Sequence, residues 1–533
     1  MYRHWGWLAC GFLLSALSSS VLALENSIGS SGIDARRLHR FPHHLTGKKI
    51  SLGQVEIGRP GKFGFDKVAA WSPPLTLAGL FFRSQLATAN IHVDNHAAMV
   101  AAIMVSRDKR LRGVAPDARL FSTAIGSFKK SGQQQECLST QHLAERNGGD
   151  IRAINFSFGE SLDRDTRENP ILDGNALLTK CIDWSARVHD VLYVVAGNQG
   201  KGGIPIPTDQ YNGITTAYTA KRKNQYVKVD FANLSDLPIG AGRRLIQREI
   251  NAGQRRAISL VAPGNQLKLF DLTGQINQVS GTSFAAPHVT ATVALLQEFS
   301  EHQLRTTQSH WDLAARRHEV MKAVLINATD KIQDYGDGLR LKMSRTVLRK
   351  DQRTWLQSDA YKNSSIPLDI QMGTGQLNAF RAYLQFKAGQ WPSESVVPNI
   401  GWDYGSVEAG TYQDYAIKQP LAKNSFASMT LVWDRWVELE DHNRNQHYDI
   451  GENFRDLGLN NLDLFLISTD GEEKTRCASV SRVDSIEHIF CEIPESGHYK
   501  IRVEYRQAVN AKEQSYALAW WTAKNSKLPM VVD

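Results

Sequence analysis

The sequence predicts an α/β domain, a parallel sheet flanked by helices, followed by an all-β jelly-roll-like sandwich. The chain has 533 residues, more than one ordinary core accommodates, so we expect two domains. Up to residue 388, apolar strands alternate with helices, as in a parallel sheet with crossover helices. From about residue 395, short β runs separated by turns are typical of a sandwich.

Composition indicates an ordinary globular protein with no nucleic-acid partner. Hydrophobic residues make up 42% of the chain and charged residues 22%. The formal net charge of +8 is modest for this length, and no run of Lys or Arg is long enough to suggest nucleic acid. We expect a monomer.

The first residues have the composition of a secretory signal peptide. Arg3 and His4 precede an apolar run from Trp5 to Leu22, and residues 21–23 offer small side chains for cleavage. An uncleaved anchor is the alternative, but serines interrupt the run and it is short for a membrane span. We therefore expect a signal peptide at 1–23 and a secreted protein, extracellular or periplasmic. No second long apolar stretch follows, so we expect no membrane span in the mature chain.

Composition also suggests where the domains begin and end. Residues 24–44 are polar and rich in turn formers, and we expect the α/β domain at 45–388. The stretch 389–396 reads as a linker, and the sandwich follows at 397–533.

Four cysteines remain once the predicted signal peptide is removed, and an even number in an exported chain suggests disulfides. Pairing nearest neighbours, Cys137 with Cys181 and Cys477 with Cys491, keeps each bridge inside one domain. The other two connectivities stay open.

Hydrophobic periodicity predicts the elements in chain order. In the α/β domain we expect strands at 49–58, 113–124, 150–159, 190–200 and 259–264, helices at 95–104, 172–188, 289–296 and 316–329, and a closing segment at 373–382. In the sandwich we expect strands at 428–433, 462–467, 488–491, 498–504 and 516–520.

The most informative stretch is residues 281–288, Gly-Thr-Ser-Phe-Ala-Ala-Pro-His, which precedes an apolar helix. A serine at that position lies at a helix N-terminus, where unpaired N–H groups and the helix dipole favour developing negative charge. Such a position suits a nucleophile, because the oxyanion that forms beside it during the reaction is stabilised there. The residue types predict Ser283 as a catalytic nucleophile.

This stretch closely resembles the serine motif of subtilisin-like serine peptidases, whose chain order is acid, base, oxyanion asparagine, nucleophile. His96 opens an apolar helix and is followed by Gly-Val-Ala-Pro at 113–116, so it is similar to the family's general base. Asn198, in Ala-Gly-Asn, resembles the oxyanion asparagine. Ala97 and Met99 replace a glycine and a second histidine of the family motif.

The acid departs from the family pattern. Glu56 ends the first predicted strand where the family has aspartate, 40 residues before His96. Glutamate also ionises at neutral pH and can orient an imidazole, but it is one methylene longer. Asp66 and Asp94 are other acids within reach, yet neither ends an apolar strand. A family variant that uses glutamate as the base lacks the histidine, which this chain retains.

The resemblance implies further features around these residues. Ser157, Phe158 and Gly159 match the strand that pairs with the substrate backbone, although Phe158 can also be read as core. Subtilisin-like zymogens usually carry a folded pro-domain, for which residues 24–46 leave no room, so we expect maturation to differ. The C-terminal strands resemble the pre-peptidase and P-type β-sandwich domains appended to secreted bacterial peptidases.

The sequence thus predicts a secreted serine endopeptidase that acts on proteins or peptides through an acyl-enzyme with a Glu56–His96–Ser283 triad. Two alternatives stay open. One is an inactive protease-fold binding protein, suggested by Glu56, Ala97 and the missing pro-domain. The other is that the sandwich is the functional domain and binds cell wall, glycan or another protein. The predicted chemistry requires no cofactor.

A structural Ca²⁺ site is predicted in the sandwich. Oxygen ligands occupy positions 1, 3, 5, 9 and 12 of a twelve-residue loop, with the His447 carbonyl at position 7; the side chains are those of Asp441, Asn443, Asn445, Asp449 and Glu452. Position 6 is Gln446, where calcium loops prefer glycine. A solvated polar turn is the alternative interpretation.

Overall fold

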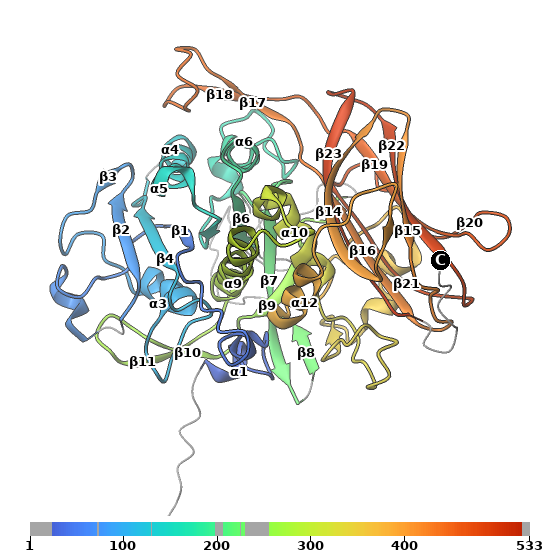
Figure 1. Cartoon of the computed structure of the whole chain (residues 1–533). Coiled ribbons are helices and arrows are strands. Elements are labelled where there is room, and N and C mark those ends of the chain that lie inside the picture. Colours follow the sequence, from blue (N-terminus) through green and yellow to red (C-terminus); the bar gives the residue numbers. More distant parts are fainter. Residues whose placement is uncertain are drawn as a thin grey trace, which may run out of the picture.

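The computed structural model of the chain describes residues 24–71, 74–128, 131–197, 206–223, 225–229 and 255–524. They form an α/β body and an all-β sandwich, which lies at the right in Figure 1. The predicted signal peptide at 1–23 lies outside the described residues. Within the described ranges, no helix has the length and apolar character needed to cross a bilayer.

The α/β body is built on a twisted, mostly parallel sheet. In spatial order its strands are β12 (Val347–Leu348), β8 (Gln225–Lys228), β7 (Ile214–Arg222), β6 (Leu192–Ala196), β5 (Ala153–Phe156), β1 (Ser51–Glu56), β4 (Arg119–Ala124), β2 (Leu77–Phe82) and β3 (Gln85–Leu86), with β9 (Leu260–Pro263) beside β7. The pairs β7–β8 and β2–β3 are antiparallel. Central β1 lies between β4 and β5 and pairs with both in parallel.

Helices cover both faces of this sheet, so its central strands are apolar on both sides. In β6, Leu192 and Val194 face one core, while Tyr193 and Val195 face the other. The first face carries α3 (Asn95–Val105), α9 (Ala286–Arg305), α10 (His318–Asn327) and α12 (Ala379–Lys387). The second carries α4 (Gln133–Ala144) and α6 (Leu177–His189). This double cover is the α/β architecture that the sequence predicts.

Short elements complete the first domain. They are α1 (Glu25–Ile28), α2 (Ala35–Leu38), α5 (Arg146–Gly149), α11 (Asp359–Lys362), the 3₁₀ turns η1 (Lys67–Trp71), η2 (Leu162–Arg164), η3 (Thr282–Phe284), η4 (Leu313–Arg316) and η5 (Trp355–Gln357), and the hairpin β10 (Leu267–Phe270) with β11 (Ile276–Val279). The segment before β1 is part of this body, since Ile28, Ile33 and Leu38 are fully buried in its core.

The sandwich consists of two facing sheets. One has the order β13 (Val396–Val397), β15 (Tyr412–Ile417), β22 (Tyr499–Gln507), β19 (Asn461–Ser468), β20 (Lys474–Ser479). The other has the order β14 (Ile400–Glu408), β23 (Glu513–Thr522), β16 (Phe426–Val432), β21 (Ile486–Glu492). A separate hairpin, β17 (Val437–Glu440) with β18 (Asn453–Asp456), extends over α4 and α6 (Figure 1).

The two parts share buried apolar side chains. Trp402 and Ala519 of the sandwich lie in the same core as α9 and α10. The side chains of Phe490 and Trp521 join a second core with Tyr226 and Trp355. The sandwich is therefore packed on the α/β body over a continuous apolar interface rather than tethered to it.

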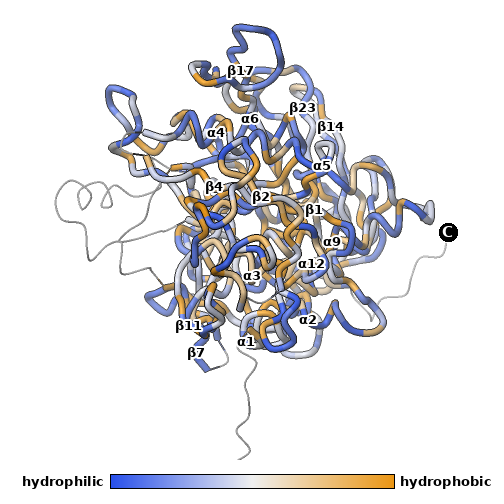
Figure 2. The backbone as a smooth tube through the Cα atoms, turned by 90° about the vertical axis from the view of Figure 1, so that its left-hand side faces the viewer, coloured by the Kyte–Doolittle hydropathy of each residue, from blue (hydrophilic) through white to orange (hydrophobic). Residues whose placement is uncertain are grey.

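Both nearest-neighbour disulfides are present, which confirms the predicted pairing. Cys137 of α4 is bonded to Cys181 of α6, and Cys477 of β20 to Cys491 of β21. The first bridge is fully buried and contacts Val437, Tyr448 and Phe454 of the β17–β18 region. Figure 2 shows that the loop beyond β17 is hydrophilic, in contrast to the apolar stretches around α3.

Candidate active site

Glu56 is the last residue of β1, at the carboxyl end of the central strand. Only 2% of the residue is exposed, although its neighbour Ile57 is half exposed. The strand fixes this position, because Leu52 and Val55 anchor β1 in the two cores. A buried carboxylate is therefore held at the edge of the sheet where parallel strands place functional groups.

His96 is the second residue of α3 and faces Glu56. Its Nδ1 lies 3.2 Å from Glu56 Oε2. Asp94 caps the helix by accepting a hydrogen bond from the Ala97 N–H at 2.8 Å, which sets where α3 begins. Because 40% of the His96 side chain is exposed, the rest of the ring remains accessible from solvent.

The charges around His96 favour its protonated form. Burial lowers the pKa of His96, but the charge and hydrogen bond of Glu56, together with the charge of Asp94, outweigh burial and raise it above its ordinary value. Glu56 Oε1 has no hydrogen-bond partner within the described part of the chain. Glu56 therefore acts on the ring through one oxygen.

Ser283 is held in η3, the turn that leads into α9. The turn begins at Gly281, whose φ of 151° suits glycine alone, and Pro287 sits in the first turn of the helix. Phe284 contacts the imidazole of His96, with ring centroids 5.4 Å apart. The serine motif and the histidine are thus brought together from α9 and α3.

A reciprocal pair of hydrogen bonds ties Ser283 to Ser157. The Ser283 hydroxyl donates to the Ser157 carbonyl at 3.2 Å, and the Ser157 hydroxyl donates to the Ser283 carbonyl at 3.0 Å. Asn155 donates its amide N–H to the Ser157 hydroxyl at 2.8 Å and accepts from Thr290 at 3.3 Å. In this conformation the Ser283 hydroxyl is engaged by the Ser157 carbonyl.

Of the other predicted residues, some lie at this site and others do not. Phe158 stacks on Phe156 with centroids 4.3 Å apart, so it is partly core as well as part of the segment beside Ser283. Asn198 lies outside the described residues. His288 of the motif is fully buried, and burial lowers its pKa to about 4 despite a bond to the Phe284 carbonyl. It is a neutral packing residue.

From the sequence, no role is predicted for Asn155, and Asp94 is named as a possible acid rather than as a helix cap. Asn155 holds the Ser157–Ser283 tether, and its only sequence signal was a polar residue inside an apolar strand. Asp94, which ranks below Glu56 as the acid, serves as the helix cap; its carboxylate bonds Ala97 N–H. Asp66 pairs with Arg59 at 2.7 Å in a fully buried ion pair.

The predicted calcium residues lie in the loop between β17 and β18, far from Ser283 in sequence and on a different domain. Asn443 and Asn445 donate their amide N–H groups to Asp449 Oδ2, at 2.7 and 2.8 Å. Asp441 accepts three backbone N–H groups, and both oxygens of Glu452 accept backbone N–H groups of the same loop. His447 bonds Glu145 at 2.8 Å through its ring.

Comparison with known proteins finds a matching family model. Residues 85–347 match the model of the Subtilase family, Peptidase_S8. The matched range includes His96, Asn198 and Ser283 but begins after Glu56. The match covers just under half of the chain, so the chain is similar to this family over that range.

Two curated relatives and one solved structure are similar to part of this chain. The chain is 24% identical over 230 residues to the Major intracellular serine protease of Bacillus subtilis (strain 168), covering 42% of this chain and 61% of that protein. It is 25% identical over 251 residues to Subtilisin Savinase of Lederbergia lenta, covering 47% and 75%. The structure of Prenylagaramide maturation protease PagA superposes with TM-score 0.38 at 18% identity, covering 63% and 93%. The chain spans about three fifths of the length of most curated relatives it matches.

Proposed function

We propose that this chain is a serine endopeptidase that hydrolyses peptide bonds of proteins or peptides through an acyl-enzyme. The observation that carries the proposal is the Glu56–His96 contact at 3.2 Å beside the Ser283 turn. A nucleophile, a base and a group that orients the base are the minimum an acyl-transfer site needs.

In the proposed reaction, Ser283 Oγ attacks the carbonyl carbon of the scissile bond and His96 Nε2 takes its proton. Glu56 holds Nδ1–H and stabilises the imidazolium, consistent with the raised pKa of His96. His96 then protonates the leaving amine, and water repeats the sequence on the acyl-enzyme. The Ser283 N–H at the start of α9 and the Asn198 amide are the proposed donors to the oxyanion.

We further propose that Ser157, Phe158 and Gly159 bind the substrate backbone. Ser157 already exchanges hydrogen bonds with Ser283, so this segment borders the reacting hydroxyl. Substrate that engages this segment would also free the Ser283 hydroxyl to rotate toward His96. We propose that the protein is exported, which is supported by the composition of residues 3–23 and by two disulfides.

Labelling with a fluorophosphonate probe tests the reaction class. The purified protein should be labelled, and Ser283→Ala should abolish labelling. Ser280→Ala, which removes a hydroxyl three residues earlier in the same loop, is the matched control and should label normally. Glu56→Ala should label far more slowly, because the base is no longer oriented.

Three results would count against the proposal. Unlabelled wild type, with an unfolding midpoint equal to that of Ser283→Ala, would favour the inactive binding protein. Equal labelling of Glu56→Ala and wild type would remove Glu56 from the site. If the protein is not labelled but binds cell-wall glycan, the sandwich would instead be the functional domain.

We also propose that the loop 441–452 binds Ca²⁺. Carboxylate and amide oxygens suit this ion, and the two asparagine amides already converge on Asp449. Turning these amides about their final torsion would present oxygen in place of nitrogen. Gln446 has a φ of 64°, so the backbone makes the left-handed turn for which calcium loops use glycine.

The calcium proposal is tested by thermal unfolding of Asp441→Ala. This variant should lower the unfolding midpoint only when calcium is present, since its carboxylate would be a ligand. Asp470→Ala, on an exposed turn of the same domain, should respond to calcium as wild type does. An equal loss with chelator present would show that Asp441 acts only through its backbone contacts.

A further inference from the structure

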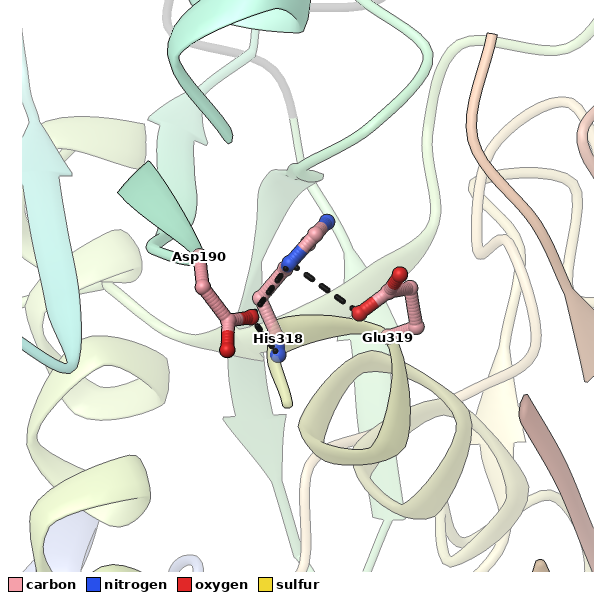
Figure 3. Close-up of side chains that lie close together, drawn as sticks. All are labelled: Asp190, His318 and Glu319. Atoms are coloured by element: carbon pink, nitrogen blue, oxygen red, sulfur yellow. Dashed lines mark hydrogen bonds and ion pairs between the residues drawn. The ribbon is translucent and has the colours of Figure 1, made fainter. Parts of the chain in front are cut away.

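A cluster of buried charged groups lies where the sandwich meets the α/β body, away from the Ser283 site. Its centre is His318, the first residue of α10, which is fully buried. Asp190 follows α6, and Asp434 follows β16 of the sandwich. Figure 3 shows Asp190 and Glu319 pointing at the ring of His318. Three separate segments, from both domains, therefore converge on one imidazole.

Both ring nitrogens of His318 face carboxylates. Nδ1 lies 2.9 Å from Asp190 Oδ1 and 3.1 Å from Glu319 Oε2. Nε2 lies 3.2 Å from Asp434 Oδ1. A neutral imidazole has one nitrogen that can only accept, and that nitrogen would face an oxygen that also only accepts. The doubly protonated ring satisfies both sides.

Other charged groups of both domains also lie around the ring. The three carboxylates are opposed by Arg317, 3.1 Å from Glu319, and by Lys322, one turn further along α10. The Tyr404 hydroxyl of β14 contacts Arg317 at 2.9 Å and Glu319 at 3.4 Å and carries no charge. Arg187 of α6 interacts with Asp434 as well, so cations and carboxylates are closely balanced, and the second ring proton is required by the carboxylate oxygens that face both nitrogens.

A divalent metal ion fits the cluster less well. An ion bound by Asp190, His318 and Glu319 would leave the imidazole neutral and would add two positive charges to a cluster that already contains Arg187, Arg317 and Lys322. It would also lie beside the Arg317 guanidinium, which bonds both acids from the other side. A second proton on the His318 ring satisfies the hydrogen-bonding groups of the cluster without a metal ion.

The neighbouring residue Arg435 shows that this is where the sandwich is fastened. Its backbone exchanges two hydrogen bonds with the Asn212 side chain, at 2.8 and 3.0 Å. Its guanidinium is buried and bonds Asp183, Asn175 and the Gly174 carbonyl of the α/β body. Asp434 is therefore held against α10 by its own chain neighbour.

We propose that His318 is a proton-operated latch, whose imidazolium docks the sandwich onto the α/β body and whose deprotonation weakens that docking. With the ring charged, carboxylates of both domains share it. Loss of the proton leaves one ring nitrogen as an acceptor that faces a carboxylate oxygen, and it removes the positive charge that lies between Asp434 of the sandwich and Asp190.

The direction of the pH dependence follows from the charges. Burial lowers the pKa of His318, but Glu319, Asp434 and Asp190 raise it well above its usual value. A raised folded-state pKa gives stability that is complete below the unfolded value and is lost as the pH rises through the folded value. The latch therefore holds at acidic and neutral pH and opens at alkaline pH.

The test follows unfolding midpoint and radius of gyration against pH in the full chain, in a Ser283→Ala background that prevents self-digestion. Above pH 7 the midpoint should fall in a step and the radius of gyration should rise with it. Adding His318→Gln should lower the midpoint at neutral pH and abolish the step. His498→Gln, which removes an exposed histidine paired with Asp470, is the control and should keep the step.

Asp434→Asn provides a milder variant that keeps the shape of the cluster. Removing one of three charges that hold the proton should move the step to lower pH by about one unit or more. Lys322 titrates nearby, since burial lowers its pKa to about 8. For this reason, the decisive comparison is between variants, because Lys322 is present in all of them.

A direct measurement does not depend on any histidine variant. Nitrogen-15 NMR of labelled histidines should show one ring with both nitrogens protonated at pH 8. A step of equal size in wild type and His318→Gln, or no fully protonated ring at pH 7, would overturn the proposal. Stoichiometric zinc or manganese that disappears in His318→Gln would replace the proton with a metal.

Discussion

Replacing Glu56 by glutamine tests the proposed triad most sharply. The change keeps the size of a buried side chain but removes the charge that lies 3.2 Å from His96 Nδ1. The amide can also present N–H to Nδ1, which favours the wrong tautomer of the base. Both effects act on the histidine without touching Ser283.

The expected loss is large. Neutralising the acid of a serine-protease triad costs roughly 10⁴-fold in turnover, which is about 5 kcal/mol of transition-state stabilisation. Glu56→Asp keeps the charge but shortens the side chain by one C–C bond of about 1.5 Å. The contact would then lengthen beyond hydrogen-bond reach, and we expect a loss of roughly 10²-fold.

The assay is kcat/KM on a peptide substrate, with unfolding midpoints to establish that each variant is folded. Asp94→Asn is the matched control, because asparagine can still cap α3 and Asp94 bonds the helix rather than the ring. It should retain activity to within roughly tenfold. If Asp94→Asn lost more activity than Glu56→Gln, or if Glu56→Asp exceeded wild type, the assignment of Glu56 as the orienting acid would be wrong.

Three further predictions follow from the contacts described. The acid limb of kcat/KM should lie above pH 6.5, because activity needs neutral His96 and its pKa is raised; in Asp94→Asn the limb should move to lower pH, and a pH–rate profile checks both. Replacing Cys137 and Cys181 by serine should cost about 4 kcal/mol in denaturant unfolding, against about 3 for Cys477 and Cys491, because their sequence separations are 44 and 14; an equal or reversed cost would contradict this entropic reasoning. Ser157→Ala should lower kcat roughly tenfold and stability by about 1–3 kcal/mol, because it removes the hydrogen bond that positions the Ser283 carbonyl and leaves the Asn155 amide unpaired; Ser161→Ala is the control, and an unchanged kcat would be the contrary result.

The sequence was most informative where apolar periodicity decides the fold. The strand expected at 49–58 is β1 at Ser51–Glu56, and the helix expected at 95–104 is α3 at Asn95–Val105. Helix α4 was not predicted, because its sequence, Gln-Gln-Gln-Glu-Cys-Leu-Ser-Thr-Gln-His-Leu-Ala, has no apolar stripe. Its polar side chains are buried by partners from elsewhere, such as Tyr448, whose backbone N–H and carbonyl both bond Gln141.

At the candidate site, the sequence could not predict contacts between residues that are distant in the chain. Glu56, His96 and Ser283 could be placed because each ends or begins an apolar element, and the structure brings Glu56 and His96 into contact beside Phe284. The rotation of the Ser283 hydroxyl toward Ser157 depends on a contact 126 residues away, which no local pattern records. His318 likewise meets Asp190 and Asp434 across 128 and 116 residues.

The hairpin of β17 and β18 has a consequence for the order in which the protein can form. Tyr448 covers the buried disulfide of α4 and α6 and bonds Gln141, 307 residues earlier in the chain. A ribosome therefore completes both helices long before it makes the residues that cover them. Closing so long a loop is slow, and the α4–α6 surface stays open to water until then. The cover over α4 and α6 is therefore completed only after β17 and β18 have been synthesised.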